Sequence, residues 1–275
     1  MPTSVDHQAP RAGDLLRWWR TRRGLSQMAL AHRVGISPRH MSFVETGRSR
    51  PGREVLIRLA EALGLPFRET NVLLESAGYA RVYRETPLGE GELARLREIL
   101  EIVLDRYEPY GAVVVDAGWT LLMANRAHVR LTRHILGERP ETDGEGRVNL
   151  LVELFRPGGF RERLRNWPEV CHHLLERLRR QVAENPTRAG FQALLEKLES
   201  YDLPPPSDVP PSPLPVLPMH FDLGGAELRL VSLVTTFGAP QDVTAQELRL
   251  EAFLPADGET DRALRALADR EGPSP

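Results

Sequence analysis

The chain has 275 residues, of which 41% are hydrophobic and 27% charged, and a formal net charge of −2, which predicts about two globular domains. It contains no apolar run near the ~20 residues that span a bilayer, and its first ten residues are too polar for a signal peptide, so we expect a cytoplasmic protein without a membrane partner. The single cysteine, Cys171, excludes an internal disulfide and a cysteine-based zinc finger, and its helical context favours a buried thiol over a redox sensor.

The first eleven residues form a polar tail that we expect to be flexible, and the first helix is predicted over residues 12–23. Leu15, Leu16 and Trp19 recur at helical spacing and give this helix an apolar stripe. Trp18 and Trp19 are adjacent and cannot both point inward, so we expect only one of them in the core.

The next two helices are separated by a tight turn. Ser26 is a good N-cap and Gly35 suits the left-handed position that ends a helix, so the first of them is predicted to end at Val34. Ser37 caps the second, and Pro38 takes its first position, where the missing N–H costs nothing. Two helices joined by so short a turn indicate a helix-turn-helix, whose second helix enters the DNA major groove.

The outward face of that second helix is unusual for a surface in water. With Met41 and Val44 as the core stripe, Arg39, Ser42 and Phe43 lie on the opposite side, and His40 lies on the flank. An arginine can pair with guanine and an aromatic edge can meet a thymine methyl group, so this face suits a groove. The alternative is that the phenyl ring packs on a neighbouring helix.

The motifs in this region resemble the phage-repressor and Cro type of helix-turn-helix, the XRE family. They are Leu25-Ser26-Gln27, Leu30-Ala31, Gly35-Ile36-Ser37, Met41-Ser42, Val44-Glu45 and Gly47-Arg48 followed by Pro51. The resemblance covers about residues 12–79 and implies an all-α, five-helix, lambda-repressor-like DNA-binding domain. It also implies that Arg20 and Glu45 form a structural ion pair and do not contact DNA.

The same resemblance implies that Gln27 binds a DNA phosphate, that arginines after the recognition helix do so too, and that Pro38, Arg39 and Phe43 occupy base-reading positions. For each loop arginine alone, a merely solvated side chain is an equal alternative. The full set of expected DNA contacts is Gln27, Ser37, Arg39, His40, Ser42, Phe43, Arg48, Arg50 and Arg53.

Charge is distributed unevenly along the chain. Residues 1–80 carry 12 basic and 7 acidic side chains, whereas the remainder carries 24 and 31. Two more helices, over residues 53–63 and 66–77, complete the basic domain, and residues 80–88 are predicted to be a connector. A basic module attached to an acidic domain is typical of a DNA-binding protein with a second function, because neutralised phosphates supply most non-specific affinity.

The second domain is predicted to mix helices and strands. An amphipathic helix over residues 91–107 is followed by two strands, a helical insert, a proline-rich stretch over 203–218 and three more strands. The strands are expected at 112–116, 120–125, 216–223, 227–237 and 247–254. The other helices are expected at 126–136, 149–155, 169–184, 188–200 and 260–270, and residues 238–245 are expected to form a polar loop.

This order resembles the ligand-binding domain of MmyB-like transcription regulators. The residues that carry the resemblance are the segments 110–119, 124–125, 149–150 and 234–244, with Phe155, Trp167 and Phe253-Leu-Pro-Ala-Asp257. It spans about residues 90–268 and implies an α+β, PAS-like domain over 89–271, with an antiparallel five-stranded sheet and a helical insert. In this family the domain encloses an apolar pocket that can hold a fatty-acid-like ligand.

Candidate pocket residues are large apolar side chains at inward positions, and a strand-ending asparagine. Plain core packing is the alternative for each apolar residue, and helix N-capping is the alternative for the asparagine. The candidates are Trp119, Met123, Asn125, Phe155, Trp167, Phe191 and Phe237.

Catalytic and metal-binding patterns are weak. His172 and His173 are adjacent and therefore lie on different faces of a helix, so no metal site is expected. There is no glycine-rich phosphate loop after a strand and no nucleophile elbow.

We therefore expect a non-enzymatic, dimeric regulator of transcription that binds double-stranded DNA and a small hydrophobic effector, with no cofactor unless a lipid is bound. The alternative is an antitoxin or another DNA-binding module that contacts a partner protein.

Overall fold

The computed structural model describes residues 11–137, 140–205, 216–223 and 227–270. Residues 1–10 of the expected flexible tail and most of the proline-rich stretch lie outside these residues. The chain divides into two compact units. The first extends to Glu85 and also includes Gln241–Gln246, and the second contains Thr86–Pro240 and the residues from Glu247 onward. The domain boundaries expected from the sequence stay a prediction.

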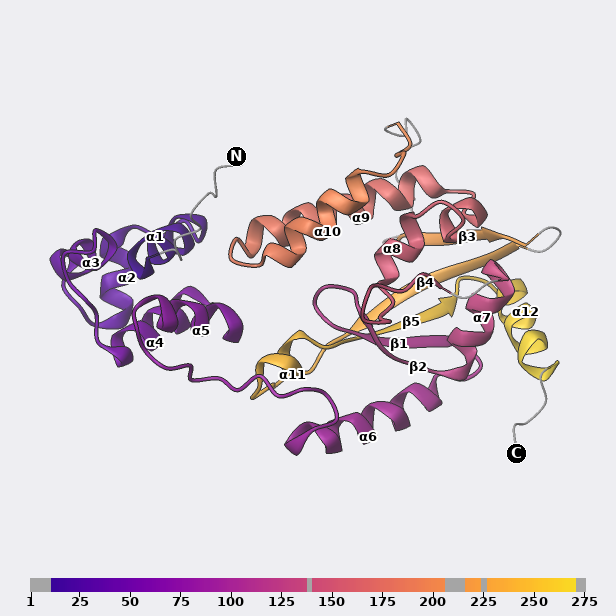
Figure 1. Ribbon diagram of the computed structural model, residues 1–275, viewed down its shortest axis with the longest axis horizontal. Helices are drawn as coiled ribbons and strands as arrows, with labels where there is room; N and C mark the ends of the chain where they lie inside the picture. Colours follow the sequence, from indigo (N-terminus) through magenta and orange to yellow (C-terminus); the bar gives the residue numbers. More distant parts are fainter. Residues whose placement is uncertain (1–10, 138–139, 206–215, 224–226, 271–275) are drawn as a thin grey trace. The chain divides into compact units, whose positions relative to one another are not determined.

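In residues 11–85, five helices build most of the first unit, as predicted. They are α1 (Ala12–Arg22), α2 (Gln27–Val34), α3 (Pro38–Glu45), α4 (Arg53–Leu63) and α5 (Phe67–Ser76) (Figure 1). The Ser26 hydroxyl accepts the N–H of Ala29 at the start of α2. Gly35 ends that helix in the left-handed conformation, with φ of 70°. Both predicted features of the turn are therefore confirmed.

Helices α1 and α3 approach one another closely in the core of the first unit. A Cβ atom on Gly13 would stand 2.6 Å from the carbonyl oxygen of Val44, so only glycine allows this approach. Met41 and Val44 are buried, which confirms the predicted core stripe of α3. Trp19 is buried and Trp18 is half-buried, with its ring edge-to-face on that of Trp19.

Two further segments, residues 82–83 and Gln241–Gln246, pack within the first unit. The buried carboxamide of Asn71 accepts the N–H groups of Val82 and Tyr83, and the ring of Phe67 stacks on that of Tyr83 at 3.9 Å. The second segment, Gln241–Gln246, comes from far along the chain, and it contains most of the short helix α11 (Val243–Glu247). The Gln246 carboxamide accepts the N–H of Phe67 at 2.8 Å.

A five-stranded antiparallel sheet is the centre of the second unit, as predicted. Its strand order is β2-β1-β5-β4-β3, so β1, β5 and β4 lie inside it (Figure 1). Val234 of β4 and Val113 of β1 both pair with Glu251 of β5. The strands are β1 (Gly111–Val115), β2 (Leu121–Ala124), β3 (Pro218–Asp222), β4 (Glu227–Thr235) and β5 (Arg249–Pro255).

Helices cover the sheet on both faces. On one face, α6 packs Leu100 and Leu104 against Ala112 and Leu250. The other face belongs to a larger core that includes side chains of α7 to α10. These helices of the second unit are α6 (Gly91–Arg106), α7 (Arg126–Leu136), α8 (Leu150–Phe155), the 3-10 turn η1 (Phe160–Arg163), α9 (Trp167–Glu184), α10 (Ala189–Glu199) and α12 (Gly258–Asp269).

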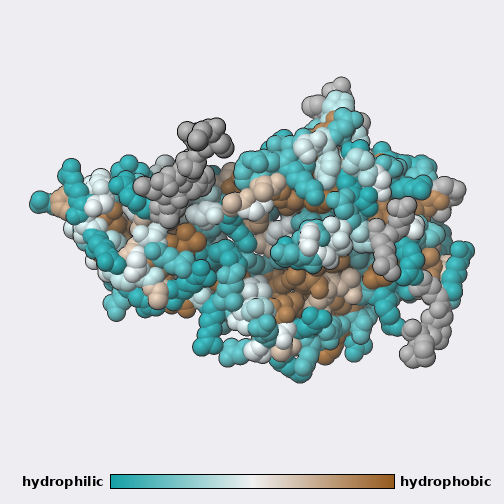
Figure 2. Space-filling view, in the orientation of Figure 1, coloured by the Kyte–Doolittle hydropathy of each residue, from teal (hydrophilic) through white to brown (hydrophobic). Residues whose placement is uncertain are grey.

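Some expectations differ in detail. Residues 238–245 were expected to be a polar loop, but α11 begins at Val243, and the side chains of Val243 and Ala245 are buried by tertiary packing that the sequence pattern does not reveal. Apolar side chains also remain at the surface, among them Leu122 on β2, and Figure 2 shows apolar surface over β1 and β2 beside α6. Among the described residues, no helix has the length and apolar character needed to cross a membrane.

Candidate DNA-binding face and ligand cavity

The exposed face of α3 carries the expected base-reading side chains. The Ser37 hydroxyl accepts the N–H of His40 at 3.1 Å and so fixes the start of the helix. Arg39 is exposed, and its guanidinium lies 5.3 Å from the centre of the half-buried Phe43 ring. Ser42 is also half-buried. The ring therefore lies at the outer surface of α3 beneath a cation, which leaves both groups on one accessible face.

A buried carboxylate holds α1, α2 and α3 together. Arg20 Nε lies 2.5 Å from Oε1 of Glu45, and Gln27 Nε2 donates to Oε2 at 2.7 Å. Arg17 approaches the same carboxylate at 3.6 Å. Burial raises the pKa of Glu45, but the hydrogen bonds from Arg20 and Gln27 and the nearby positive charges outweigh it, and the pKa is lowered. Arg20 and Glu45 are thus an internal ion pair, and one amide hydrogen of Gln27 is used inside the domain.

The loop arginines differ in their surroundings. Arg50 donates to the carbonyl of Gly78 at 3.3 Å, and its guanidinium lies 4.8 Å from the centre of the Tyr79 ring. Arg48 and Arg53 are exposed, and within the described residues the guanidinium of neither has a hydrogen-bond or ion-pair partner. Two of the three arginines are therefore available to phosphates without breaking an internal contact.

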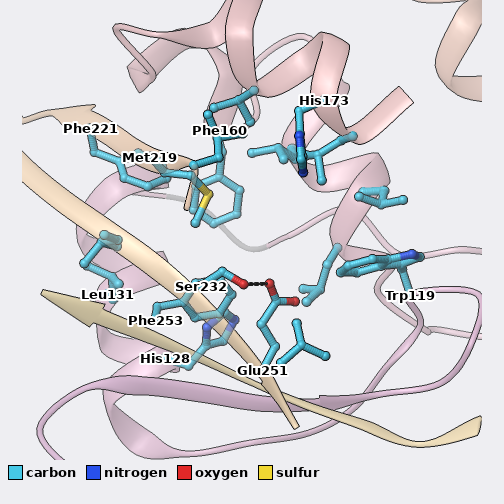
Figure 3. Close-up of a pocket in the computed structure, with 18 of the residues that line it drawn as sticks. Trp119, His128, Leu131, Phe160, His173, Met219, Phe221, Ser232, Glu251 and Phe253 are labelled. Atoms are coloured by element: carbon cyan, nitrogen blue, oxygen red, sulfur yellow. Dashed lines mark hydrogen bonds between the residues drawn. The ribbon is translucent and has the colours of Figure 1, made fainter. Parts of the chain in front are cut away.

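The second unit contains a cavity of about 450 Å³ on the face of the sheet opposite α6. This volume lies in the range of roughly 300–1,000 Å³ that is usual for small-molecule sites. Most of its wall is apolar. Figure 3 shows Phe160, Met219 and Phe221 on one side, Trp119 on another and Glu251 at the base. Strands β3, β4 and β5 and helices α7, α8 and α9 all contribute side chains.

Six polar side chains of the described part of the chain also line the cavity. The Ser232 hydroxyl donates to Oε1 of Glu251, and the Thr132 hydroxyl lies 3.4 Å from Nε2 of His128. Burial raises the pKa of the Glu251 carboxyl. Burial lowers the pKa of His128 to about 4, so its imidazole is neutral at pH 7. The remaining polar lining residues are His173 and Arg177.

Of the seven candidate pocket residues, Trp119 lines this cavity. It is buried, and the guanidinium of Arg177 stands 4.6 Å from the centre of its ring. Met123 lies in the core between the sheet and α6, because its side chain points to the other face of β2. Phe237 packs at the edge of that same core. Neither therefore contributes to the wall.

The other candidates serve the core and the helix ends. Phe155 is fully buried, and its ring lies edge-to-face with that of Trp167 at 4.9 Å. Phe191 is buried below the guanidinium of Arg188. Asn125 caps α7, since its side-chain oxygen accepts the N–H of His128. Phe155, Trp167 and Phe191 therefore take part in packing, and Asn125 is a helix N-cap. These were the alternatives to a role in the pocket.

The polar lining residues were missed from the sequence. Ser232 and Glu251 alternate with apolar residues in β4 and β5, and a charged residue in a buried strand is the one signal that could have identified Glu251. Cys171 is buried in the core, and burial raises the pKa of its thiol to about 11, which agrees with an unreactive thiol.

Comparisons with known proteins match both units. Residues 96–267 match the family described as MmyB-like transcription regulator ligand binding domain, and residues 11–73 match a helix-turn-helix domain. No curated protein matches the chain.

Similar solved structures include two of ClgR, the clp gene regulator of Corynebacterium glutamicum. One is 34% identical and covers 24% of this chain and 84% of that chain, with a TM-score of 0.22. The other is 28% identical and covers 37% of this chain and 99% of that chain, also with a TM-score of 0.22. ComR from Streptococcus suis is 14% identical over 68% and 66% of the two chains, with a TM-score of 0.21.

Proposed function

Because the chain belongs to the MmyB-like transcription regulators, we propose that it binds a specific site in double-stranded DNA under the control of a small hydrophobic effector. The observation that carries the proposal is the apolar cavity of about 450 Å³ in the second unit of a chain whose first unit is a helix-turn-helix. A fatty acid or a molecule of similar shape would bury its hydrocarbon against these walls. The protein would act in the cytoplasm, where its operator is accessible.

On the DNA side, we assign base reading to Arg39 and Phe43 and phosphate contacts to Arg48 and Arg53. The exposed guanidinium of Arg39 can donate two hydrogen bonds to guanine, and the ring beside it can meet a thymine methyl group. Ser37, His40, Ser42, Gln27 and Arg50 are proposed as additional contacts. Two copies of the chain would place their recognition helices in successive major grooves of a roughly palindromic operator.

Coupling between effector and DNA is proposed to run through the connection between β4 and β5. Both strands contribute cavity residues, namely Ser232 and Glu251. The segment between them, Gln241–Gln246, belongs to the first unit, where Gln246 binds the first N–H of α5. A ligand that shifts β4 against β5 would therefore displace a segment of the DNA-binding unit.

The DNA assignment is tested by replacing the base-reading arginine. With an operator recovered by in vitro selection, Arg39→Ala should weaken binding by about 1–3 kcal/mol, roughly 5- to 150-fold, in a fluorescence anisotropy titration. Arg58→Ala, which removes an exposed arginine from α4, is the matched control and should leave the affinity unchanged. Equal affinities for the Arg39→Ala and parent proteins would refute the assignment. The complex should contain two chains per operator.

The effector assignment is tested by native mass spectrometry of the purified full chain, followed by extraction of small molecules. A bound lipid-like molecule that is released on unfolding supports the proposal. A stoichiometric partner polypeptide, with no small molecule retained, would instead identify the second unit as a protein-binding module of the antitoxin kind.

A further inference from the structure

Among the described residues that line the cavity, Glu251 is the one with an acidic side chain. It projects from the middle of β5, where its neighbours on the two adjacent strands are Val113 and Val234. Only 7% of the residue is exposed. Taking a carboxyl group out of water is costly unless hydrogen bonds replace the lost solvation, so its position on the cavity wall needs a reason.

Among the described residues, only one of the two oxygens of the Glu251 carboxyl group has a hydrogen-bond donor. Oε1 accepts the hydroxyl of Ser232, and no other described residue donates to either oxygen. Figure 3 shows this hydrogen bond at the base of the cavity, with the second carboxyl oxygen on the side towards Trp119. The nearby positive charges of Arg177 and Arg249 favour the ionised form, whereas burial disfavours it more strongly. One acceptor oxygen is therefore left for a bound molecule.

We propose that Glu251 is the polar anchor of the cavity, and that it accepts a hydrogen bond from a hydroxyl group on an otherwise apolar effector. The surrounding walls, which include Leu131, Met219 and Phe253, would hold a hydrocarbon body. This inference rests on the proposed function, because it specifies the polar group of the effector in that same cavity.

The alternative anchor is Arg177, which would select an anion such as a fatty-acid carboxylate. Its guanidinium already lies over the Trp119 ring, and its side chain is half-buried at the wall. A second carboxylate placed near Glu251 would be repelled or would have to share a proton with it. A neutral hydroxyl meets neither penalty, and it can also offer its own oxygen to a cationic neighbour.

Matched ten-carbon probes test the proposal. The full chain, freed of bound lipid on a hydrophobic resin, is titrated calorimetrically with decan-1-ol and with decanoate. Decan-1-ol should bind the parent protein at least about tenfold more tightly than decanoate. Glu251→Met, which removes the acceptor but keeps an unbranched side chain, should weaken decan-1-ol binding by about tenfold or more and should not weaken decanoate binding.

Two further variants control the interpretation. Glu176→Met changes the same residue type on the exposed side of α9 and should leave both affinities unchanged. Glu251→Gln keeps the shape and a neutral acceptor, so it should reduce decan-1-ol binding by less than Glu251→Met does. This graded effect remains measurable if the Met variant fails to fold.

The outcomes separate this inference from the proposed function. Unchanged decan-1-ol affinity in Glu251→Met overturns the inference. Tighter binding of decanoate than of decan-1-ol, abolished by Arg177→Met, overturns it too, but leaves the hydrophobic effector intact. If neither probe binds and no small molecule is extracted from the purified protein, both proposals fail.

Discussion

At the scale of single residues, the buried Glu45 links three helices of the first unit. Glu45 closes the recognition helix, and its carboxylate is shared by Arg20, Gln27 and Arg17. These contacts link α1 and α2 to the end of α3 and so fix the angle at which α3 is presented. An ion pair of this kind does more for geometry than for net stability, but breaking it leaves a charge without its partner.

Removing one partner of this pair should therefore destabilise the protein. Arg20→Met should lower the free energy of unfolding by about 3 kcal/mol, because Glu45 stays buried while its main donor is lost. The loss is measured by urea denaturation followed by circular dichroism. In the double variant with Glu45→Met, most of the lost free energy should return. A double variant as unstable as the single one would show that packing of the arginine side chain, and not its charge, matters here.

The neutral imidazole of His128 predicts a dependence of stability on pH. In the unfolded chain a histidine titrates near pH 6.5, whereas burial lowers the pKa of His128 to about 4 in the folded protein. Between these two values only the unfolded chain takes up the proton, so the free energy of unfolding falls as the pH falls from 6.5 to 4. The total loss would be about 3 kcal/mol.

His128→Gln keeps a group that can reach Thr132 but has no titration in this range. Its free energy of unfolding should therefore fall less than that of the parent protein between pH 7 and pH 4, by up to about 3 kcal/mol. Parallel urea titrations at several pH values measure this difference. Identical slopes for the two proteins would mean that the imidazole is protonated as easily when folded as when unfolded.

At the scale of elements, α11 carries the proposed coupling between effector and DNA. It lies between the two strands that carry Ser232 and Glu251, and its residues up to Gln246 belong to the DNA-binding unit. Val243 is fully buried there, and its N–H donates to the carbonyl of Arg84 at 2.9 Å. The segment is therefore held by both side-chain burial and backbone hydrogen bonds.

Removing the hydrogen bond between the Gln246 side chain and the backbone of Phe67 should weaken the effect of the effector on DNA affinity. Gln246→Ala removes the acceptor for the N–H of Phe67, so the change in DNA affinity caused by the effector should shrink towards none, while DNA affinity without effector stays within about twofold. Anisotropy titrations with and without the extracted effector measure both quantities. Gln192→Ala, which removes an exposed glutamine of α10, is the matched control. A full response in Gln246→Ala would place the coupling elsewhere.

At the scale of the whole molecule, a regulator of this kind obeys thermodynamic linkage. If the effector changes DNA affinity by some factor, DNA must change effector affinity by the same factor, whatever path couples the sites. A coupling of about 1–3 kcal/mol corresponds to roughly 5- to 150-fold.

We expect these two factors to agree when effector binding is titrated calorimetrically with and without saturating operator DNA. Arg39 is a proposed base reader and does not line the cavity, so Arg39→Ala should keep the effector affinity of the free parent protein. Two unequal factors would show that the protein samples a further state, such as a change in oligomeric state, during one of the titrations.

The sequence by itself determined what depends on near neighbours. Ser26, Gly35 and Ser37 place the helix ends of the DNA-binding motif through contacts only three to five residues long, and these predictions are confirmed. The two-unit architecture and the five-stranded sheet followed from periodicity and from the family resemblance, because alternation along a strand needs no knowledge of its partners.

Only the tertiary structure decided where the cavity lies and what lines it. A cavity is a place where helices and strands fail to fill the space between them, so it depends on how several distant elements pack. Met123 and Phe155 were expected there as large apolar residues, but packing placed them in the two cores. The hydrogen bond between Ser232 and Glu251 and the docking of Gln246 on Phe67 likewise join residues that are 19 and 179 positions apart, and no local pattern carries that information.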